Sequence, residues 1–566
     1  MVERADAAAR SSEREVAKRK LASGGEHRYR YDARGRILEA STEQHDVQLR
    51  HDGSGRRLSD VRDGVGIEHR LYGDGGRRTR VLGRFHTSSD GGSAGTEVLV
   101  GPSGSKSTLR FDEHGLVARQ CANGTWELSQ YDDEGRLEGR LVWKRASAQS
   151  GGDGAIQGWS VRYEWTAEGD LVRVVDSLRG TTVYRTDAAH RLIGERTPDG
   201  QELSYDLDLA DNVLSKPKPG RQGVSRVEVG SGNRLVASDT ETFTYDVRDQ
   251  LSTRRDRRTG ATTHYVYDSF DMLVRIETRG PDGAELEPAW QYTYDALGRR
   301  TEVRRGGYRR QFYWDGDRLA AEVMPNGALR VYEYAGHGAL VPLAFTDYAS
   351  ADASPESGRH YTVFTDPVGQ PLQIEDAKGQ LVWFATRVDP YGHIEVHPAS
   401  QLEYNLRWPG HYYDPETALP YNRYRYYDPA LGRYLQTDPL GYEGSPTNLY
   451  GYPANPLTDV DVLGLTHPAR SSRSSRSTGG DSDGSEGTTP TTAGRPGRPA
   501  TGAVHDPAAV HLLNDPTRQP TVTVDGTRRQ ALATHPAGRA GTPVTVINGR
   551  HAGTTMDGVT RDANGS

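Results

Sequence analysis

The chain has 566 residues, with 70 basic and 77 acidic side chains that are interspersed rather than grouped, and a net charge of −7. This pattern argues against a nucleic-acid-binding stripe and against a polybasic membrane patch. The single cysteine, Cys121, excludes an intrachain disulfide framework and a multi-cysteine metal site. No run approaches the ~18 apolar residues that span a bilayer. The polar segment 1–25 lacks the apolar stretch of a secretory signal.

Glycine and tyrosine dominate the composition in a way that disfavours helices. The chain contains 66 Gly, 30 Pro and 30 Tyr against 8 Phe. Glycine marks turns and tyrosine favours half-exposed strands. The composition therefore indicates many short strands joined by tight turns, and the length indicates more than one structural unit.

An internal repeat fills residues 26–400. Copies include "YRYDARGRIL" from Tyr29 and "YTYDALGRRT" from Tyr292, and the aspartates at 32 and 52, and at 112 and 132, are 20 residues apart. Alternating aromatics predict strands, and Asp-x-x-Gly predicts a turn whose carboxylate binds backbone N–H groups while Gly supplies a positive φ. Each unit of about twenty residues is thus one hairpin, and hairpins must stack to be stable. A propeller is disfavoured, because its blades recur at ~40–50 residues.

The repeat resembles the YD repeat of Rhs and teneurin-type proteins. A more specific match follows it at 401–465, where "RWPGHYYDPETALPYNRYRYYDPALGRYLQTDPLGYEG" and the following residues to Leu465 resemble the Rhs repeat-associated core. The resemblance implies an all-β fold in which hairpins form a long sheet that spirals into a hollow shell, capped by the core segment. Whether 26–400 completes the shell stays open, since a separate chain or an N-terminal extension could supply missing wall.

The resemblance also implies cleavage of the chain at the C-terminal edge of the core, between Leu465 and Thr466. Two aspartates form the expected aspartic-type site: Asp438, in Asp-Pro439-Leu-Gly441, and Asp461, in Asp-Val-Leu-Gly464. Two carboxylates that share a site tend to hold one proton between them, so that one polarises the scissile carbonyl and the other activates water. The nearest charge expected to orient them is Arg433. Pro456 and Gly464 complete the motif.

Two features depart from the family pattern. Val462 replaces a proline, and the 19-residue spacer from Gly441 to Asp461 is one residue longer than usual. Asp459 lies on the same strand face as Asp461 and is an alternative partner. Asp438 and Asp461 could also be ordinary turn aspartates, because most Asp-x-x-Gly matches are. Nothing in the sequence indicates a metal site or a cofactor.

The composition changes after Leu465. Residues 466–504 form a Ser/Thr/Gly/Pro/Arg linker that is expected to be disordered. Residues 505–566 predict one or two helical turns and short strands in "PTVTVDGTRRQALATH" and "GTPVTVINGRHAGTT". Their position implies a variable cargo with a toxin-like role, although His511, Asp515, His535 and His551 form no convincing catalytic set.

Two functions therefore remain. In the first, the shell encloses its own C-terminal cargo, releases it by self-cleavage, and is delivered from the cytoplasm by a specialised export system, with an immunity protein and an N-terminal or secretion partner implied. In the second, the chain is a non-catalytic YD-repeat interaction protein at a cell surface, or an inactive fragment.

Overall fold

The computed structural model describes residues 16–20, 26–72, 76–91, 95–145, 156–218, 223–336, 339–443 and 447–465, and four short strands between Thr521 and Arg561. Every regular element in these residues is a β-strand or a three-residue 3-10 helix, namely η2 (Ser231–Asn233), η3 (Pro355–Ser357) and η4 (Gly441–Glu443). No helix in this part of the chain has the length and apolar character needed to span a membrane. The all-β prediction is confirmed.

The first half of the chain forms one antiparallel meander, in which each strand pairs with the next along the sequence. Its strands are β1 (Val16–Lys20), β2 (Glu26–Tyr31), β3 (Ile37–Ser41), β4 (Asp46–His51), β5 (Arg57–Arg62), β6 (Val65–Leu71), β7 (Arg77–Val81), β8 (Phe85–Gly91), β9 (Thr96–Val100), β10 (Lys106–Phe111), β11 (Leu116–Gln120), β12 (Trp126–Tyr131), β13 (Leu137–Arg145), β14 (Ile156–Trp165), β15 (Leu171–Asp176), β16 (Gly180–Thr186), β17 (Leu192–Arg196) and β18 (Glu202–Ser204).

A second meander of 18 strands continues the ribbon. Its strands are β19 (Asp206–Leu207), β20 (Val213–Pro217), β21 (Val224–Val229), β22 (Leu235–Ser238), β23 (Glu241–Tyr245), β24 (Leu251–Asp256), β25 (Thr262–Tyr267), β26 (Leu273–Arg279), β27 (Trp290–Tyr294), β28 (Arg300–Arg305), β29 (Tyr308–Asp315), β30 (Arg318–Val323), β31 (Leu329–Glu333), β32 (Ala344–Tyr348), β33 (Arg359–Thr365), β34 (Pro371–Asp376), β35 (Leu381–Val388) and β36 (Ile394–Val396).

The turn chemistry predicted from the repeat closes these hairpins. Asp32 Oδ1 accepts hydrogen bonds from the backbone N–H groups of Arg34 and Arg36, both at 2.9 Å, and its Oδ2 accepts one from the Arg36 side chain. The same pair of backbone bonds, two and four residues on, recurs at Asp52, Asp132, Asp187, Asp208, Asp246, Asp268, Asp295, Asp366 and Asp376. The fourth turn residue has a positive φ, as at Gly35 (77°).

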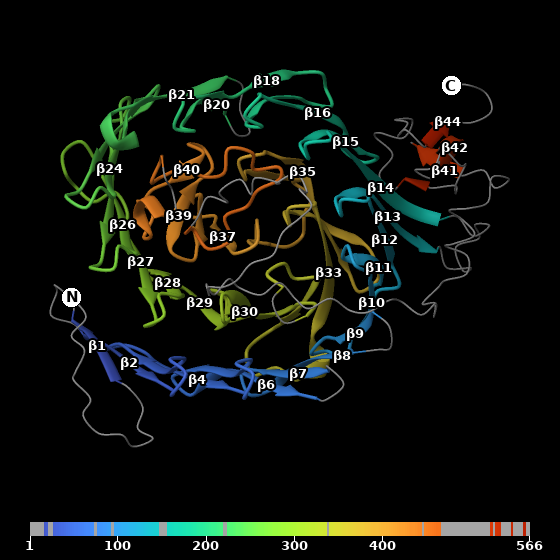
Figure 1. Cartoon of the computed structure of the whole chain (residues 1–566), viewed down its shortest axis with the longest axis horizontal. Coiled ribbons are helices and arrows are strands. Elements are labelled where there is room, and N and C mark those ends of the chain that lie inside the picture. The colour runs from blue at the N-terminus through green and yellow to red at the C-terminus, as the bar shows by residue number, and fades with distance from the viewer. Residues whose placement is uncertain are drawn as a thin grey trace, which may run out of the picture.

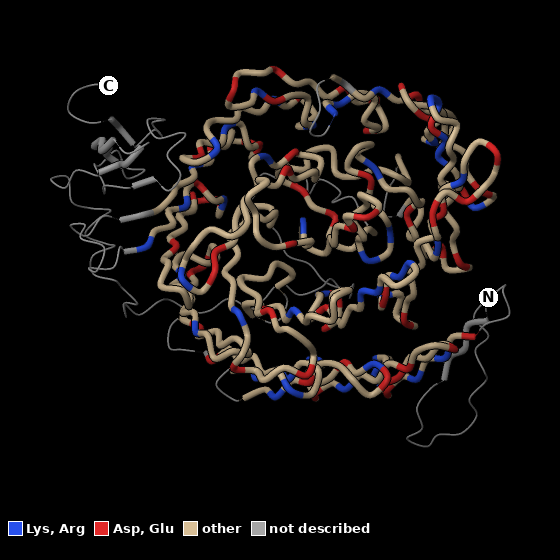
Figure 2. The backbone as a smooth tube through the Cα atoms, turned by 180° about the vertical axis from the view of Figure 1, so that it is seen from behind, with Lys and Arg blue, Asp and Glu red and all other residues tan. Residues whose placement is uncertain are grey.

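The ribbon curves around and then turns inward, as Figure 1 shows. The strands from β1 to β9 run along one side, β10 to β27 complete the curve, and β28 to β36 pass inside it, where β29 packs on β6. Acidic and basic residues are interspersed along the whole ribbon (Figure 2). No pairing among the described strands closes the ribbon into a complete ring. The spiral shell is therefore confirmed, with an open edge.

Residues 401–465 lie within the curve of the ribbon (Figure 1). They contain a four-stranded sheet of β37 (His411–Asp414), β38 (Leu419–Asn422), β39 (Arg425–Asp428) and β40 (Arg433–Tyr434). Aromatic contacts fix this sheet to the wall, since the rings of Phe312 and Tyr412 lie 4.9 Å apart. A buried ion pair adds to them, because the Arg300 guanidinium donates to both Asp414 oxygens at 2.5 and 2.8 Å.

The tail contributes four described strands, β41 (Thr521–Val524), β42 (Thr527–Ala533), β43 (Thr545–Val546) and β44 (Val559–Arg561). β41, β42 and β44 form a small sheet, and β43 pairs in parallel with Gln157 and Gly158 of β14. Figure 1 shows β41, β42 and β44 outside the curve of the ribbon. The tail strands predicted around 521–546 are confirmed. The predicted linker at 466–504 and the helical turns lie outside the described residues.

We expect the contact between the two layers of the ribbon to depend on Arg299. Its side chain is 3 % exposed and pairs with Asp60 at 2.5 Å and with Asp295 at 2.9 Å. Arg299→Leu removes the ion pair of Asp295 and leaves Asp60 with only the more distant Arg57, at 3.6 Å, among the described residues, so it should lower the unfolding free energy by about 3 kcal/mol. The melting temperature followed by circular dichroism measures the effect. Arg305→Leu, which removes a surface pair with Glu287, is the matched control, expected to cost ~1 kcal/mol or less. Equal losses would contradict the assignment.

Candidate functional site

Asp438 and Asp461 meet at one buried arginine that the sequence analysis missed. Arg425, on β39, has a fully buried side chain, and its Nη2 lies 3.0 Å from Asp438 Oδ2 and 3.0 Å from Asp461 Oδ2. Asp438 follows β40, while Asp461 follows the long return of the chain from residue 447. The structure therefore brings the two predicted aspartates together, but through a guanidinium.

The Asp461 carboxylate organises the end of the core segment. Its Oδ1 lies within hydrogen-bond distance of the backbone N–H groups of Leu463 (3.3 Å), Gly464 (2.8 Å) and Leu465 (3.2 Å). Its Oδ2 accepts from the Tyr434 hydroxyl at 3.0 Å as well as from Arg425. One carboxylate thus holds the three residues before the predicted cut in a tight turn.

Asp438 uses the same arrangement on the other side of Arg425. Its Oδ1 accepts the backbone N–H of Leu440 at 2.8 Å, and its own N–H donates to the Leu449 carbonyl at 2.9 Å. Gly441 of the predicted motif follows with a φ of 62° and donates its N–H to the Asp438 carbonyl. Both predicted Asp-x-x-Gly turns are therefore present in the structure.

Arg425 also fixes the chain at the predicted cut. Its Nε donates to the Gly464 carbonyl at 2.6 Å, its Nη1 donates to the Leu449 carbonyl at 3.1 Å, and its guanidinium lies 3.7 Å from the centre of the Tyr434 ring. A guanidinium offers five donors in a fixed plane, which suits several acceptors at once. Arg425 consequently contacts both aspartates, the Tyr434 ring and the backbone of the turn before the cut.

Arg433 does not have the role predicted for it. Its guanidinium lies against the wall, where it donates to the Asn233 carbonyl and to Asn212 Oδ1, and it packs over the Tyr450 ring at 4.7 Å. Burial among these neutral groups lowers its pKa from the ordinary arginine value. The nearest charge to the aspartates is Arg425, and the prediction for Arg433 is corrected.

The remaining predicted residues are distributed around the site. Asp459 does not join the pair through Arg425, and its carboxylate accepts from the Thr458 hydroxyl at 3.1 Å. Pro439 lines one cavity and Pro456 lines another. Thr466, on the far side of the predicted cut, lies outside the described residues.

Close backbone packing places the turn before the cut. A Cβ on Gly410, whose φ is 82°, would lie 1.9 Å from the Val462 carbonyl oxygen, and a Cβ on Gly464 would lie 2.7 Å from the Asn422 carbonyl oxygen. Only glycine permits both the positive φ and the approach. Val462, where the family usually has proline, is thus accommodated beside a glycine.

An aromatic wall surrounds the turn and changes the chemistry of one histidine. Trp408, Tyr427, Tyr434 and Tyr452 form a buried cluster, and the His411 ring lies 5.4 Å from Trp408. His411 Nε2 lies 3.1 Å from the Asp461 carbonyl oxygen, and burial lowers the pKa of His411 to about 4. The neutral ring therefore donates to the backbone of the aspartate.

A guanidinium lies between the two carboxylates that the sequence predicts to act as a pair. A cation at this position offsets the like-charge repulsion between the two Oδ2 atoms. The site combines a buried positive charge, two hydrogen-bonded carboxylates and a fixed peptide, which are the parts needed for base-assisted hydrolysis with charge stabilisation. They are equally compatible with a structural clamp.

Comparison with known proteins identifies the fold family. A sequence model described as Teneurin YD-shell matches residues 164–456, just over half of the chain. The chain belongs to this family. The YD-repeat resemblance is thereby confirmed, and the match extends from β14 into the core segment, up to nine residues before Leu465.

Several relatives of this YD-shell chain are named as toxins. It is 32 % identical over 381 residues to "Double-stranded DNA deaminase toxin A" of Burkholderia cenocepacia, covering 63 % of the chain and 25 % of that protein. It is 30 % identical over 505 residues to "Toxin protein Tse5" of Pseudomonas aeruginosa, covering 79 % and 37 %. The chain thus spans about a quarter to a third of these relatives. Among solved structures, "Crystal Structure of TcdB2-TccC3-Cdc42" aligns with 79 % of the chain and 28 % of that chain at 17 % identity, with a TM-score of 0.42.

We expect Gly410→Ala to disrupt the turn before the cut. The added methyl group would overlap the Val462 carbonyl and force a positive φ on alanine, so the melting temperature should fall by several degrees, equivalent to more than about 2 kcal/mol. Gly441→Ala is the matched control, because it imposes a similar φ (62°) in open space and should cost ~1 kcal/mol. A control that is as damaging as Gly410→Ala would refute the close-contact explanation.

The low pKa of His411 predicts that the stability of the fold depends on pH. Because His411 titrates near 4 when folded and near its ordinary value of 6.5 when unfolded, the unfolded chain binds the extra proton first as the pH falls. The stability contribution of neutral His411 is present above pH 6.5 and is lost towards pH 4, by roughly 2–3 kcal/mol. His411→Gln, which keeps a donor, should show a smaller drop in melting temperature between pH 7 and pH 4.5 than the wild type. His114→Gln, at a partly exposed turn, should leave the drop unchanged.

Proposed function

We propose that the chain is the shell part of a toxin-type YD-shell protein that cuts its own backbone between Leu465 and Thr466. The observation that carries the proposal is the buried Asp438–Arg425–Asp461 arrangement, in which the arginine also binds the Gly464 carbonyl. A plain structural turn needs one carboxylate. Here a second carboxylate from a distant loop converges on the same guanidinium beside the peptide that would be cut.

In the proposed reaction, Asp438 accepts a proton from a water molecule, whose oxygen attacks the Leu465 carbonyl carbon. Arg425 offsets the negative charge that develops on the carbonyl oxygen, as a preorganised donor does in other hydrolytic sites. The proton then passes to the Thr466 nitrogen as the C–N bond breaks. The products are a Leu465 carboxylate and a Thr466 amine, with one water consumed. Asp461 keeps residues 463–465 in the reactive turn.

The relatives support the toxin-type assignment of the chain as a whole, and not an activity for its tail. The proteins named as a deaminase toxin and as Tse5 are three to four times as long as the part that this chain matches. The activities in their names are therefore not assigned to this chain. For this chain the proposal covers a shell and a released C-terminal piece, with an immunity protein and an export partner as further expected components.

Enclosure of the tail is proposed for the segment next to the cut. The described tail strands β41, β42 and β44 lie outside the curve of the ribbon (Figure 1). The start of the tail is different, because Leu465 is fixed within that curve by Asp461. The shell is therefore proposed to hold the first residues of the released piece.

A second function remains supported by one observation. Asp461 Oδ1 faces three backbone N–H groups, which is how a turn aspartate is used throughout the repeats. In a non-catalytic YD-repeat interaction protein, Arg425 would clamp the two loops and no bond would break. The two functions differ in one measurable property, the integrity of the chain.

Purified wild-type chain is expected to run as two pieces under denaturing conditions, the smaller of roughly a hundred residues, with the N-terminal sequence Thr-His-Pro-Ala. Asp438→Asn should leave a single intact band, because an amide cannot accept the proton from water and the rate should fall at least ~100-fold. Arg425→Met should also stop cleavage, through loss of charge stabilisation.

Asp459→Asn is the control, since its carboxylate does not reach Arg425, and it should cleave normally. Circular dichroism should show that Asp438→Asn keeps its β structure. An intact wild-type band would contradict self-cleavage and favour the clamp. Cleavage that survives Asp438→Asn would remove Asp438 from the mechanism.

A further inference from the structure

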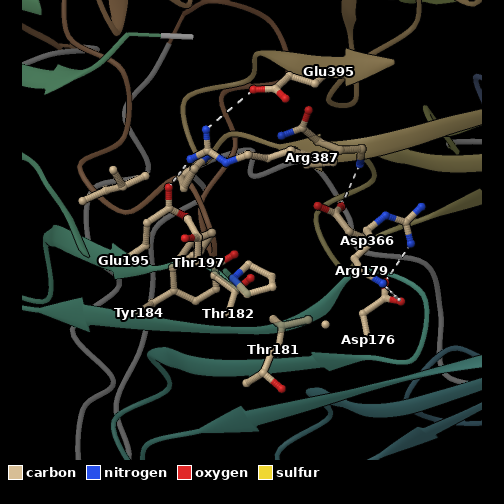
Figure 3. A pocket seen from close by; sticks show the side chains of 18 of the residues that line it. Asp176, Arg179, Thr181, Thr182, Tyr184, Glu195, Thr197, Asp366, Arg387 and Glu395 are labelled. Carbon is tan, nitrogen blue, oxygen red and sulfur yellow. Dashed lines mark hydrogen bonds and ion pairs between the residues drawn. The ribbon is translucent and has the colours of Figure 1, made fainter. Parts of the chain in front are cut away.

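A second cavity lies between the wall and the inner strands, beside the candidate site but separate from it. It measures about 880 Å³ and is lined by β14 to β18, by the turns around β33 to β35, and by Pro456 and Leu457 of the core segment. Figure 3 shows Asp366, Arg179, Glu195 and Arg387 around it, with Asp176 and Glu395 paired to the arginines. Its lining combines apolar side chains with several charged and polar groups that could orient a ligand.

Asp366 is an acidic group in this lining without a salt bridge among the described residues. Its Oδ1 accepts the backbone N–H groups of Val368 (3.1 Å) and Gln370 (2.8 Å), the same pattern as at Asp32. The nearby cation Arg140 is committed to Glu127 at 2.9 Å. Burial raises the pKa of Asp366 to about 7. The other repeat turns with arginine four residues on satisfy their carboxylate with that side chain, and Gln370 takes this place here.

Two further polar atoms in the lining have no hydrogen-bond partner within the described residues. They are the Tyr163 hydroxyl and Gln370 Oε1, on side chains that are 4 % and 2 % exposed. A buried polar group without a partner costs stability, so such atoms indicate an occupant that supplies one. Gln370 Oε1 and the Asp366 carboxylate both need donors. A guanidinium provides several donors with a positive charge.

We propose that this cavity binds the segment that follows Leu465, with the guanidinium of Arg470 against the Asp366 carboxylate and Gln370. Arg470 is the first arginine after the predicted cut, in "THPARSSRSSRS". The charge of the lining favours a cationic occupant, because its acidic residues outnumber its basic ones. The acidic residues are Asp176, Glu195, Asp199, Asp366 and Glu395, and the basic residues are Arg179, Lys218 and Arg387.

The cavity lies within reach of the cut. A Cβ on Gly369, in the Asp366 turn, would lie 3.0 Å from Pro409, and the next residue, Gly410, approaches the Val462 carbonyl. Two residues therefore separate the Asp366 turn from the turn before the cut. Five extended residues from Thr466 to Arg470 span up to ~17 Å. The segment can reach Asp366 while Leu465 stays bound to Asp461.

This binding site deepens the proposed function and rests on it, because that function encloses the first residues of the tail. The cavity gives those residues a place to bind. This binding does not require the Leu465–Thr466 bond to be cut. A covalently attached segment and a released one carry the same arginine. After a cut, this contact would retain the released piece in the shell.

The test is the reactivity of three matched arginines in the full chain. Arg470, Arg473 and Arg476 are each followed by serine. Phenylglyoxal is small enough to enter a shell, and mass spectrometry after digestion measures modification at each position over time. At pH 8 we expect Arg470 to react roughly tenfold more slowly than Arg473 and Arg476, because a charge-assisted contact must open first. In Asp366→Asn, which keeps the Oδ1 acceptor of the turn, the three rates should become equal.

Asp199→Asn is the control, since Asp199 lines the same cavity but is bound by Thr197 and Gln201, and it should leave Arg470 slow. Gln370→Met provides a second variant that keeps the backbone N–H to Asp366, and it should raise the Arg470 rate. Equal rates in the wild type would overturn the proposal. So would an Arg470 that stays slow in Asp366→Asn and Gln370→Met. A gel of the same samples reports cleavage separately.

Discussion

In most aspartate turns of the repeat, the carboxylate accepts hydrogen bonds from backbone N–H groups two and four residues further on, and at Asp112 from those two and three residues on. This interaction fixes the hairpin loop, puts the fourth residue in the left-handed region and introduces one bulge in the ladder, as between Arg30 and Tyr31. Where glycine is missing, His190 and Asp211 still adopt a φ of 59°. A turn held by the carboxylate therefore forms without glycine. A ribbon of identical turns then has a constant local twist, from which a continuous curve follows.

The candidate site uses the same interaction in a different environment. Asp438 and Asp461 each bind backbone N–H groups through Oδ1, as the repeat aspartates do. What differs is the neighbour of Oδ2. In the repeats it is commonly an arginine four residues on, whereas here both Oδ2 atoms face Arg425 from another strand. A turn element has thereby been placed at a buried point where two loops converge. The tyrosines around it keep the three charged side chains buried, which strengthens each charge interaction.

The sequence predicted the local features because they depend on neighbours in the chain. Tyrosine alternation and Asp-x-x-Gly specify strands and turns within about ten residues, and these are present. The sequence did not predict that β28 to β36 pass inside the curve or that the ribbon has an open edge. Both depend on the sum of small twists over many hairpins, and no short sequence pattern specifies that sum. Arg425 and Arg433 illustrate the same limit. Both lie in tyrosine-rich strands of the core, and only the three-dimensional pairing of β39 with the returning loop distinguishes them. Asp366 likewise has an ordinary turn sequence, and its place in a cavity depends on strands that are far apart in the chain.

Buried ion pairs between layers give the site its position. Arg300 of the wall binds Asp414 of the core segment, Arg310 of the wall binds Glu403, and Arg423 of the core segment binds Asp317. Such pairs add little net stability compared with apolar contacts, because desolvation offsets most of the attraction. These ion pairs disfavour other registers of the core segment, because a shift by one residue would leave several buried charges without partners. Tyrosine and aliphatic contacts would tolerate such a shift, but the charges would not. The same pairs that hold residues 401–465 in one register therefore fix Arg425 beside both aspartates and beside Gly464.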